Sequence, residues 1–362
     1  MSATSKDPFV YIGTYTENDE SQSKGIYVYR MDSSSGELAF VSEAKGILNP
    51  SYLEIHPEQR FLYAVNEVQS FSGKEGGGVS ALSIDAPSGA LNALNAHSSH
   101  GQDPCYISIE QTGRFALVAN YSSGSVAMLP IHADGQLGPA TDVVQHAGSS
   151  IHPERQTSAH AHCILPDPHN RFAIAVDLGL DKLLVYEMDL ELGKLKKQNE
   201  VNVKAGAGPR HLTFHPNGQY AYLINELNST LTVYRYQSAT GSFEELQTLP
   251  ALPADFTGEN LCADVHVSPN GNYLYASNRG HDSIACFFID QTTGELIYLR
   301  HTDCGGREPR NFAIDPSGTF LLAANQNSHT IVTFRIDSES GELSKTEPEA
   351  PVSMPVCVKF AS

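Results

Sequence analysis

Residues 208–226, GPRHLTFHPNGQYAYLINE, place an arginine and a carboxylate at the two ends of one predicted β-hairpin. Two runs of alternating apolar residues flank a turn at 215–218, so the strands run antiparallel and their outer ends meet at one edge of the sheet. Arg210 and Glu226 are therefore expected side by side. They could form only a cross-strand ion pair. Alternatively, the guanidinium could hold an anionic group of a substrate while the carboxylate transfers a proton.

The same hairpin pattern recurs along the chain, and each copy opens its second strand with an aromatic residue. Two further strand signals around a glycine turn follow each hairpin, so one unit is four antiparallel strands in about fifty residues. Units of this kind are typical of propeller blades. The aligned aromatic residues are Phe61, Phe115, Phe172, Tyr220, Tyr273 and Phe320.

Six units are complete, and the two ends of the chain together supply a seventh. Residues 9–15 and 25–41 form a unit without its first strand, and residues 354–360, MPVCVKF, read as that missing strand. Joining both ends in one blade closes the ring and removes an open sheet edge. The sequence therefore predicts an all-β, seven-bladed β-propeller, a single domain over residues 1–362 with no helical part.

Two positions in each unit are expected at the mouth of the central channel. The first strand of a blade lies innermost and the second runs back against it, so the start of the first and the end of the second meet at one face. The first position, ten residues before the aromatic, carries Ser51, Cys105, His162, Arg210, Ala263 and Arg310. The second position, six residues after it, carries Tyr15, Glu67, Tyr121, Leu178, Glu226, Arg279 and Gln326.

These two positions differ from their neighbours because their residue types change from blade to blade. The position before the second one is nearly uniform, as expected of side chains that cap turns. That structural series is Thr14, Asn66, Asn120, Asp177, Asn225, Asn278 and Asn325. Arginines, glutamates, tyrosines and a histidine that converge on one channel mouth instead indicate a binding site built on a repetitive scaffold.

Other catalytic patterns are weak. His160 and His162 alternate onto one side of an extended segment and could be metal ligands, but no third ligand stands at a suitable spacing, so no metal site is predicted. The repeat places no histidine beside Cys105, and the chain has no G-x-S-x-G elbow. The glycine-rich stretch 73–80 lacks the phosphate-loop pattern.

The formal net charge of −18 argues against nucleic-acid or anionic-membrane partners. Clustered arginines are then informative, because the chain has only 23 lysines and arginines, and they suggest a small anionic ligand. The N-terminal segment lacks the apolar run of a signal peptide, and none of the six cysteines forms CxxC. We expect a cytoplasmic protein, a monomer or a weak homo-oligomer. The variable loops 69–78 and 146–160 are candidates to cover the site.

Seven segments together resemble the lactonase family of seven-bladed propellers, which includes 6-phosphogluconolactonases and fungal carboxy-cis,cis-muconate lactonizing enzymes. The resemblance covers nearly the whole chain and implies a channel-mouth site formed by His162, Arg210, Glu226 and Arg279. One departure is Ser158-Ala159, where relatives often have proline before His160. The matching segments are 11–16 (YIGTYT), 63–67 (YAVNE), 160–163 (HAHC), 208–211 (GPRH), 224–226 (INE), 277–284 (SNRGHDSI) and 309–318 (PRNFAIDPSG).

The resemblance implies hydrolysis of 6-phospho-D-glucono-1,5-lactone, a reaction of the pentose phosphate pathway, without a cofactor. Glu226 or His162 would take the proton of the attacking water, and Arg210 would hold the oxyanion. Arg279 and Arg310 would bind phosphate or hydroxyl groups. Further substrate contacts are expected from Tyr15, Glu67, Tyr121, His160, His211 and Gln326. Two alternatives remain open, namely a lactonizing cycloisomerase or lyase acting on an unsaturated carboxylic acid, and a non-catalytic interaction propeller.

Overall fold

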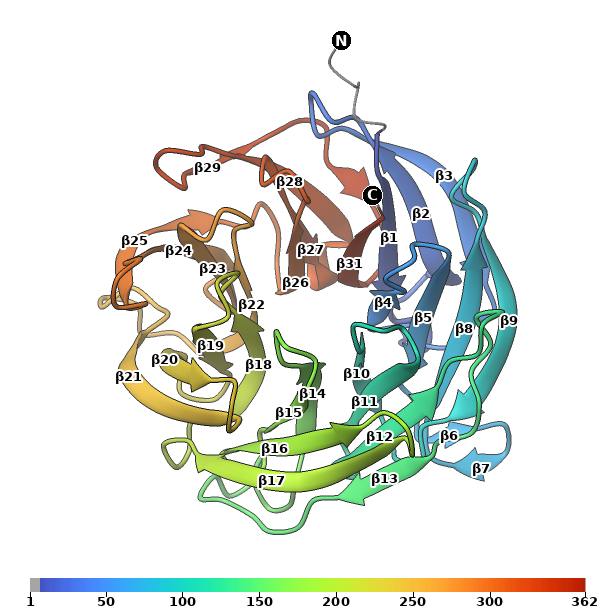
Figure 1. Ribbon diagram of the computed structural model, residues 1–362. Coiled ribbons are helices and arrows are strands. Elements are labelled where there is room, and N and C mark those ends of the chain that lie inside the picture. The colour runs from blue at the N-terminus through green and yellow to red at the C-terminus, as the bar shows by residue number, and fades with distance from the viewer. Residues whose placement is uncertain (1–6, 362) are drawn as a thin grey trace.

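The computed structural model describes residues 7–361, whose strands form seven antiparallel sheets arranged around a central channel (Figure 1). Residues 1–6 and 362, the ends of the predicted domain, lie outside the described residues. Each sheet has four principal strands, as the repeat predicts. No α-helix occurs between residues 7 and 361, and the only helical element there is the 3₁₀ turn η1 (Gln326–Ser328). In that range no helix is long and apolar enough to cross a membrane.

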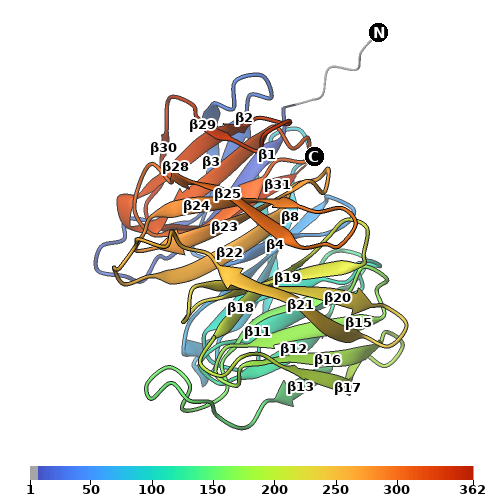
Figure 2. The same cartoon turned by 90° about the vertical axis from the view of Figure 1, so that its left-hand side faces the viewer.

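The strands take four positions, from the channel to the rim of the ring (Figures 1 and 2). The innermost strands are β31 (Pro355–Ala361), β4 (Leu53–Ile55), β10 (Pro104–Ile109), β14 (Ala161–Pro166), β18 (Pro209–Phe214), β22 (Leu261–Val267) and β26 (Pro309–Ile314). The second strands are β1 (Phe9–Thr14), β5 (Phe61–Asn66), β11 (Phe115–Asn120), β15 (Phe172–Asp177), β19 (Tyr220–Asn225), β23 (Tyr273–Arg279) and β27 (Phe320–Asn325).

The third strands are β2 (Gly25–Met31), β8 (Gly78–Ile84), β12 (Ser125–Pro130), β16 (Lys182–Asp189), β20 (Thr230–Gln237), β24 (Ser283–Ile289) and β28 (Thr330–Ile336). The outermost are β3 (Leu38–Lys45), β9 (Leu91–Ser98), β13 (Asp142–Gln145), β17 (Lys194–Asn202), β21 (Ser242–Pro250), β25 (Leu296–Asp303), and β29 (Leu343–Lys345) with β30 (Ala350–Pro351). A small hairpin of β6 (Ser70–Phe71) and β7 (Lys74–Glu75) fills the variable loop 69–78.

The ring closes as predicted, because the C-terminal strand β31 pairs antiparallel with β1. Phe9 is opposite Ala361 and Ile12 is opposite Val358. All six residues of β1 are buried, so this pairing also completes the core between the first and last blades. The prediction of a seven-bladed propeller with this closure is confirmed.

Neighbouring blades interlock through a glycine and an aromatic ring. The glycine in the turn between the third and fourth strands of one blade packs against the aromatic residue that opens the second strand of the preceding blade. Each of these glycines has a φ of 64–83°, where a side chain is strained. The pairs are Gly36 with Phe320, Gly89 with Phe9, Gly135 with Phe61, Gly193 with Phe115, Gly241 with Phe172, Gly294 with Tyr220, and Gly341 with Tyr273.

A Gly135→Ala variant is expected to lower the free energy of unfolding by about 2–4 kcal/mol, because it adds ring overlap to backbone strain. A Cβ at Gly135 would lie 2.2 Å from Phe61 Cδ1, at a φ of +83°. Gly46 is a matched control, since its φ is +80° and a Cβ there would meet nothing within 4 Å. Gly46→Ala should cost only about 1 kcal/mol. Equal losses for both variants in urea unfolding would contradict the interlock.

The nearly uniform position before the second variable one, which holds Thr14 and six asparagine or aspartate residues, has the structural role that the sequence predicts. Asn66 Nδ2 donates to Leu48 O, Asn278 Nδ2 donates to Ala251 O, and both acceptors lie in the segments that connect blades. All of these side chains belong to residues with at most 2 % exposure. They fix the ends of the second strands at the mouth, directly before the variable position.

Candidate active site

Bulges at the start of the inner strands aim the first variable position into the channel. The pairing shifts by one residue within Pro104/Tyr106, Ala161/Cys163, Pro209/His211 and Pro309/Asn311. The extra residue of a bulge is free of the strand alternation, and bulges commonly re-aim a side chain beside an active site. The residues in the bulges are Cys105, His162, Arg210 and Arg310, and Val356 holds the same place in β31.

A repeated backbone hydrogen bond positions the second variable residue. Its N–H donates to the carbonyl of the residue that leads into the inner strand of the same blade. That carbonyl residue has a positive φ in five blades, at Asn49, Asp103, Gly208, Glu308 and Met354, and this turns the chain into the mouth. The bonds run from Glu67 N to Asn49 O (3.1 Å), from Tyr121 N to Asp103 O (2.9 Å) and from Glu226 N to Gly208 O (2.7 Å), with the same arrangement for Tyr15 and Gln326.

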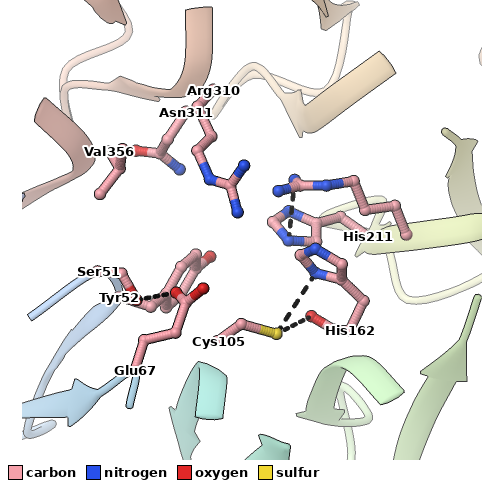
Figure 3. A pocket seen from close by; sticks show the side chains of 10 residues that line it. Ser51, Tyr52, Glu67, Cys105, His162, His211, Arg310, Asn311 and Val356 are labelled. Carbon is pink, nitrogen blue, oxygen red and sulfur yellow. Dashed lines mark hydrogen bonds between the residues drawn. The ribbon is translucent and has the colours of Figure 1, made fainter. Parts of the chain in front are cut away.

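Residues at the two variable positions, together with some of their neighbours, line two adjoining cavities. The inner cavity has a volume of about 10 Å³ and the outer cavity about 220 Å³. Four residues line both of them, namely Glu67, Cys105, His162 and Arg310. The other lining residues are Ser51, Tyr52, Arg210, His211, Asn311 and Val356 for the inner cavity (Figure 3), and Tyr121, Arg155, Glu226, Leu261 and Arg279 for the outer one.

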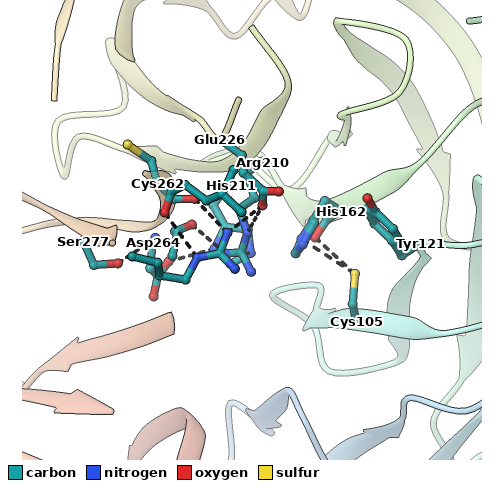
Figure 4. Close-up of polar contacts among 12 residues, drawn as sticks. Cys105, Tyr121, His162, Arg210, His211, Glu226, Cys262, Asp264 and Ser277 are labelled. Carbon is teal, nitrogen blue, oxygen red and sulfur yellow. Dashed lines mark hydrogen bonds and ion pairs between the residues drawn. The ribbon is translucent and has the colours of Figure 1, made fainter. Parts of the chain in front are cut away.

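Glu226 is the centre of a buried ion cluster at the outer cavity (Figure 4). Its Oε2 accepts hydrogen bonds from Arg210 Nε and Arg279 Nη2, both at 2.9 Å, and its Oε1 accepts one from Arg155 Nη2 at 2.6 Å. Burial raises the pKa of Glu226, but the charges of Arg279, Arg210 and Arg155 more than offset burial and lower that pKa to about 2. Glu226 is therefore a permanent carboxylate that fixes three guanidiniums.

Glu67 is the other carboxylate of the site, and its environment is different. Tyr15 Oη donates to its Oε1 at 2.9 Å, and Ser51 Oγ donates to its Oε2. Burial raises the pKa of Glu67, and the opposing charge of Arg310 does not cancel that shift. A carboxylate with a raised pKa is a stronger base than an ordinary glutamate, which suits it to take a proton from water and return it later.

The guanidinium of Arg310 has no hydrogen bond or ion pair among residues 7–361. It lies over the ring of Tyr15, 5.5 Å from the centroid, and lines both cavities. Figure 3 shows it pointing into the inner cavity opposite the carboxylate of Glu67. An arginine whose donors face a cavity is a natural receptor for an oxyanion or a phosphate.

His162 faces the cavity beside Cys105, with its Nδ1 3.7 Å from the Cys105 sulfur. The expectation that no histidine lies beside Cys105 is wrong, because the inner strands β10 and β14 of adjacent blades lie side by side, which brings the residues in their bulges together. Burial, followed by the charge of Arg210, holds the pKa of His162 well below its usual range. Burial, followed by the charge of Glu67, raises the pKa of the Cys105 thiol. Both groups are therefore neutral, and Cys105 is a poor nucleophile.

His211 links the cluster to a buried aspartate beneath it (Figure 4). Its Nδ1 donates to Asp264 Oδ1 at 2.8 Å, and its Nε2 lies 3.3 Å from Arg210 Nη1. Asp264 also accepts hydrogen bonds from Asn311 Nδ2 and His266 Nε2, and it is almost fully buried. Burial, followed by Arg210, lowers the pKa of His211 to about 4. A neutral His211 thus orients Arg210 rather than transferring a proton.

Of three further predicted residues, only Tyr121 lines a cavity. Tyr121 lines the outer cavity and its hydroxyl accepts a hydrogen bond from Arg155 at 3.1 Å. His160 stacks on the ring of Tyr121 at 4.7 Å and its Nδ1 lies 3.0 Å from Tyr121 O, so it lies behind the cavity wall. Gln326 opens η1 and lines neither cavity.

Two residues that matter in the structure were missed in the sequence. Arg155 lies in the loop 146–160, which the sequence predicts to cover the site because its length differs from that of the other connections. The repeat has no equivalent position for Arg155, so the arginine itself was not predicted. Asp264 follows the first variable position of its blade and looked like an ordinary strand residue. Within residues 7–361, no group of three or more histidine, cysteine, aspartate or glutamate side chains has a geometry suited to a metal ion.

Comparison with known proteins gives one consistent result. The family model described as "Lactonase, 7-bladed beta-propeller" matches residues 9–360. The 6-phosphogluconolactonase of Bacillus subtilis is 37 % identical over 350 residues, covering 97 % of both chains. The 6-phosphogluconolactonase of Formosa agariphila is 36 % identical, covering 84 % of this chain and 86 % of its own. The structure of the periplasmic gluconolactonase of Pseudomonas aeruginosa superposes with a TM-score of 0.92 at 36 % identity, covering 99 % of both chains.

Proposed function

The chain belongs to the lactonase family of seven-bladed β-propellers, and from this membership we propose that it hydrolyses 6-phospho-D-glucono-1,5-lactone to 6-phosphogluconate in the pentose phosphate pathway. The observation that carries the mechanism is the pair of adjoining cavities, which share four lining residues. The outer one suits a single sugar ring, and the inner one has about the space of one water molecule, surrounded by polar groups. Glu67, Cys105, His162 and Arg310 stand where water and lactone would meet.

In this mechanism Glu67 is the general base. Its carboxylate takes a proton from water in the inner cavity while the water oxygen forms a bond to the lactone carbonyl carbon. When the tetrahedral intermediate collapses, the bond from that carbon to the ring oxygen breaks. The protonated Glu67 then returns the proton, directly or through His162, to the departing ring oxygen. We therefore assign proton transfer to Glu67 rather than Glu226, whose pKa of about 2 makes it a weak base.

Arg310 supplies the charge that stabilises the oxyanion. Its guanidinium is free of hydrogen-bonding partners among residues 7–361, so its donors are available when negative charge develops on the carbonyl oxygen. The sequence favoured Arg210 for this role. Arg210 already donates from Nε to Glu226 and from Nη1 to Ala263 O at 2.6 Å, so we assign it to holding the shape of the site.

The alternatives are less well supported. A lyase that closes or opens a lactone needs proton transfer to carbon and uses no water. That reaction would not explain a polar cavity with room for one water molecule. An interaction propeller gives no reason to bury ionised arginines and a glutamate at the channel mouth, an arrangement that costs desolvation. The names of the curated relatives also favour hydrolysis.

Three predictions from the sequence accompany this proposal. We expect one domain over residues 1–362, a monomer or weak homo-oligomer, and a cytoplasmic location. Size-exclusion chromatography with light scattering measures the oligomeric state, and fractionation of cells measures the compartment.

A panel of 6-phospho-D-glucono-1,5-lactone, D-glucono-1,5-lactone and a muconate-type unsaturated acid tests the proposed function. The wild type should accelerate hydrolysis of the phosphorylated lactone above the buffer rate and leave the unsaturated acid unchanged. Arg310→Gln should lower kcat about 100-fold, because it removes the oxyanion donor. No acceleration with any lactone would refute the hydrolase proposal, and turnover of the unsaturated acid alone would favour the lyase.

A further inference from the structure

The loop 146–160 forms part of the wall of the outer cavity, and hydrogen bonds hold it in place. Gln156 is fully buried, its Nε2 donates to Leu178 O at 2.8 Å, and its Oε1 accepts from His152 N at 3.1 Å. Ser150 Oγ donates to Asp181 Oδ2 at 2.6 Å. These bonds tie the loop to the blade that follows it and give the intervening Arg155 a fixed base from which to reach the mouth.

Arg155 is the most accessible arginine of the Glu226 cluster. Its side chain is 34 % exposed, whereas those of Arg210 and Arg279 are 2 % and 5 % exposed. Both of its side-chain hydrogen bonds, to Glu226 and Tyr121, come from Nη2. Its Nε and Nη1 donate to no group among residues 7–361, so one side of the guanidinium remains available to a ligand.

The lining of the two cavities has an excess of positive charge, although the chain as a whole carries −18. Four arginines line the two cavities: Arg155, Arg210, Arg279 and Arg310. The carboxylates of Glu67 and Glu226 line them as well, and Glu308 lies 3.7 Å from Arg279 Nη1, so one positive charge is left unbalanced. A bound anion would restore the balance, and the mouth is where a hydrated dianion loses least solvation.

The chemistry of the substrate indicates which arginine meets its phosphate. With the carbonyl carbon between Glu67 and Arg310, the ring occupies the outer cavity. The phosphate is on C6, the exocyclic carbon attached to C5, so it extends outside the ring. Arg155 is the partly exposed arginine that lines the outer cavity and keeps donors that are free among residues 7–361, so it can meet the phosphate there.

We propose that Arg155 is the residue that recognises the phosphate of the substrate and so distinguishes a phosphorylated sugar lactone from an unphosphorylated one. This inference rests on the proposed function. It concerns selectivity between substrates, whereas Glu67 and Arg310 concern the rate of hydrolysis of either lactone. Arg155 is thus a specificity residue supplied by a loop outside the repeat.

The test compares kcat/KM of Arg155→Gln on 6-phospho-D-glucono-1,5-lactone and D-glucono-1,5-lactone. We expect a loss of about 10- to 100-fold on the phosphorylated lactone, the worth of a hydrogen bond to a charged group. On the unphosphorylated lactone the loss should be about threefold or less. Arg155→Lys, which keeps the charge, should recover part of the difference. Arg171→Gln is the control, because Arg171 is half-exposed and pairs with Glu187 away from the site.

Equal losses on both lactones would overturn the inference and make Arg155 a positioning residue that acts through Glu226. No loss on either would overturn it as well. Inorganic phosphate gives an independent measurement. It should bind to the wild type in calorimetry and bind much more weakly to Arg155→Gln, and unchanged phosphate binding would contradict the proposal. An inactive wild type would refute the proposed hydrolysis without affecting this binding result.

Discussion

Replacing Glu67 with glutamine is expected to lower kcat for lactone hydrolysis about 100- to 10,000-fold, with KM changed by about threefold or less. Glutamine keeps the size of the side chain. Its carbonyl oxygen can accept a hydrogen bond from one of the hydroxyls of Tyr15 and Ser51, and its NH2 group can donate to the oxygen of the other. It cannot take a proton from water. Because the arginines that would bind the substrate remain in place, the loss should fall on kcat, and steady-state kinetics on the phosphorylated lactone measures it.

Glu54→Gln is the matched control for this variant. Glu54 lies on the inner strand of the same blade and pairs with Lys359 at 2.9 Å, but it lines neither cavity. Its kcat should stay close to that of the wild type. A Glu67→Gln variant with wild-type kcat would remove Glu67 from proton transfer.

The pH dependence of kcat/KM provides a second readout of Glu67. The base must be ionised, and burial raises the pKa of Glu67, so the rate should fall on the acidic side at a pH above the ordinary range of a glutamate. Glu226 cannot produce this limb, because its pKa is about 2. The limb should disappear in Glu67→Gln.

Replacing Glu226 with glutamine is expected to lower the free energy of unfolding by about 3–5 kcal/mol at neutral pH. The substitution leaves Arg210 and Arg279, both nearly fully buried, without their carboxylate. Hydrolysis should fall as well, because the guanidiniums lose their fixed positions. Urea unfolding of the two proteins measures the difference, and a loss below about 1 kcal/mol would mean that the cluster contributes little to the fold.

The same variant should flatten the acid dependence of stability. The folded pKa of Glu226 is about 2, below the ordinary glutamate value of 4.5, so the unfolded chain binds more protons between these two values. The stabilisation from Glu226 is therefore complete above about pH 4.5 and is lost as pH falls towards 2. It amounts to about 3 kcal/mol. The stability difference between wild type and Glu226→Gln should shrink by that amount on acidification.

Much of the fold could be predicted because the same four-strand pattern occurs in seven units of the sequence. The aromatic residue that opens each second strand aligns the blades. This register alone predicts that one mouth contains Arg210, Glu226, Arg279, His162 and Arg310. The alignment works because equivalent positions in a closed ring point to the same axis. In a regular strand, successive side chains point to opposite faces of the sheet, so strand alternation alone does not explain why the first variable position points into the channel. The bulges in the inner strands explain this orientation, and the sequence did not predict them.

The division of roles between the two glutamates could not be predicted from the sequence. Glu67 and Glu226 occupy the same register, and the sequence favoured Glu226 because arginine stands beside it in the hairpin. The structure shows that Arg155, from a loop, and Arg279, from the next blade, both donate hydrogen bonds to Glu226 and help to keep it ionised. The pKa of Glu226 depends on arginines from other blades and loops. An alignment of the repeats shows which residues are equivalent, but it does not show which of them contact each other between blades.

The central claim is that this propeller hydrolyses a sugar lactone with Glu67 as the base. The most direct test follows the disappearance of 6-phospho-D-glucono-1,5-lactone by NMR in parallel samples containing wild type, Glu67→Gln or buffer alone. We predict that the lactone lifetime shortens in proportion to the wild-type concentration, and that the same concentrations of Glu67→Gln leave it close to the buffer value. Equal acceleration by both proteins, or none by the wild type, would contradict the claim.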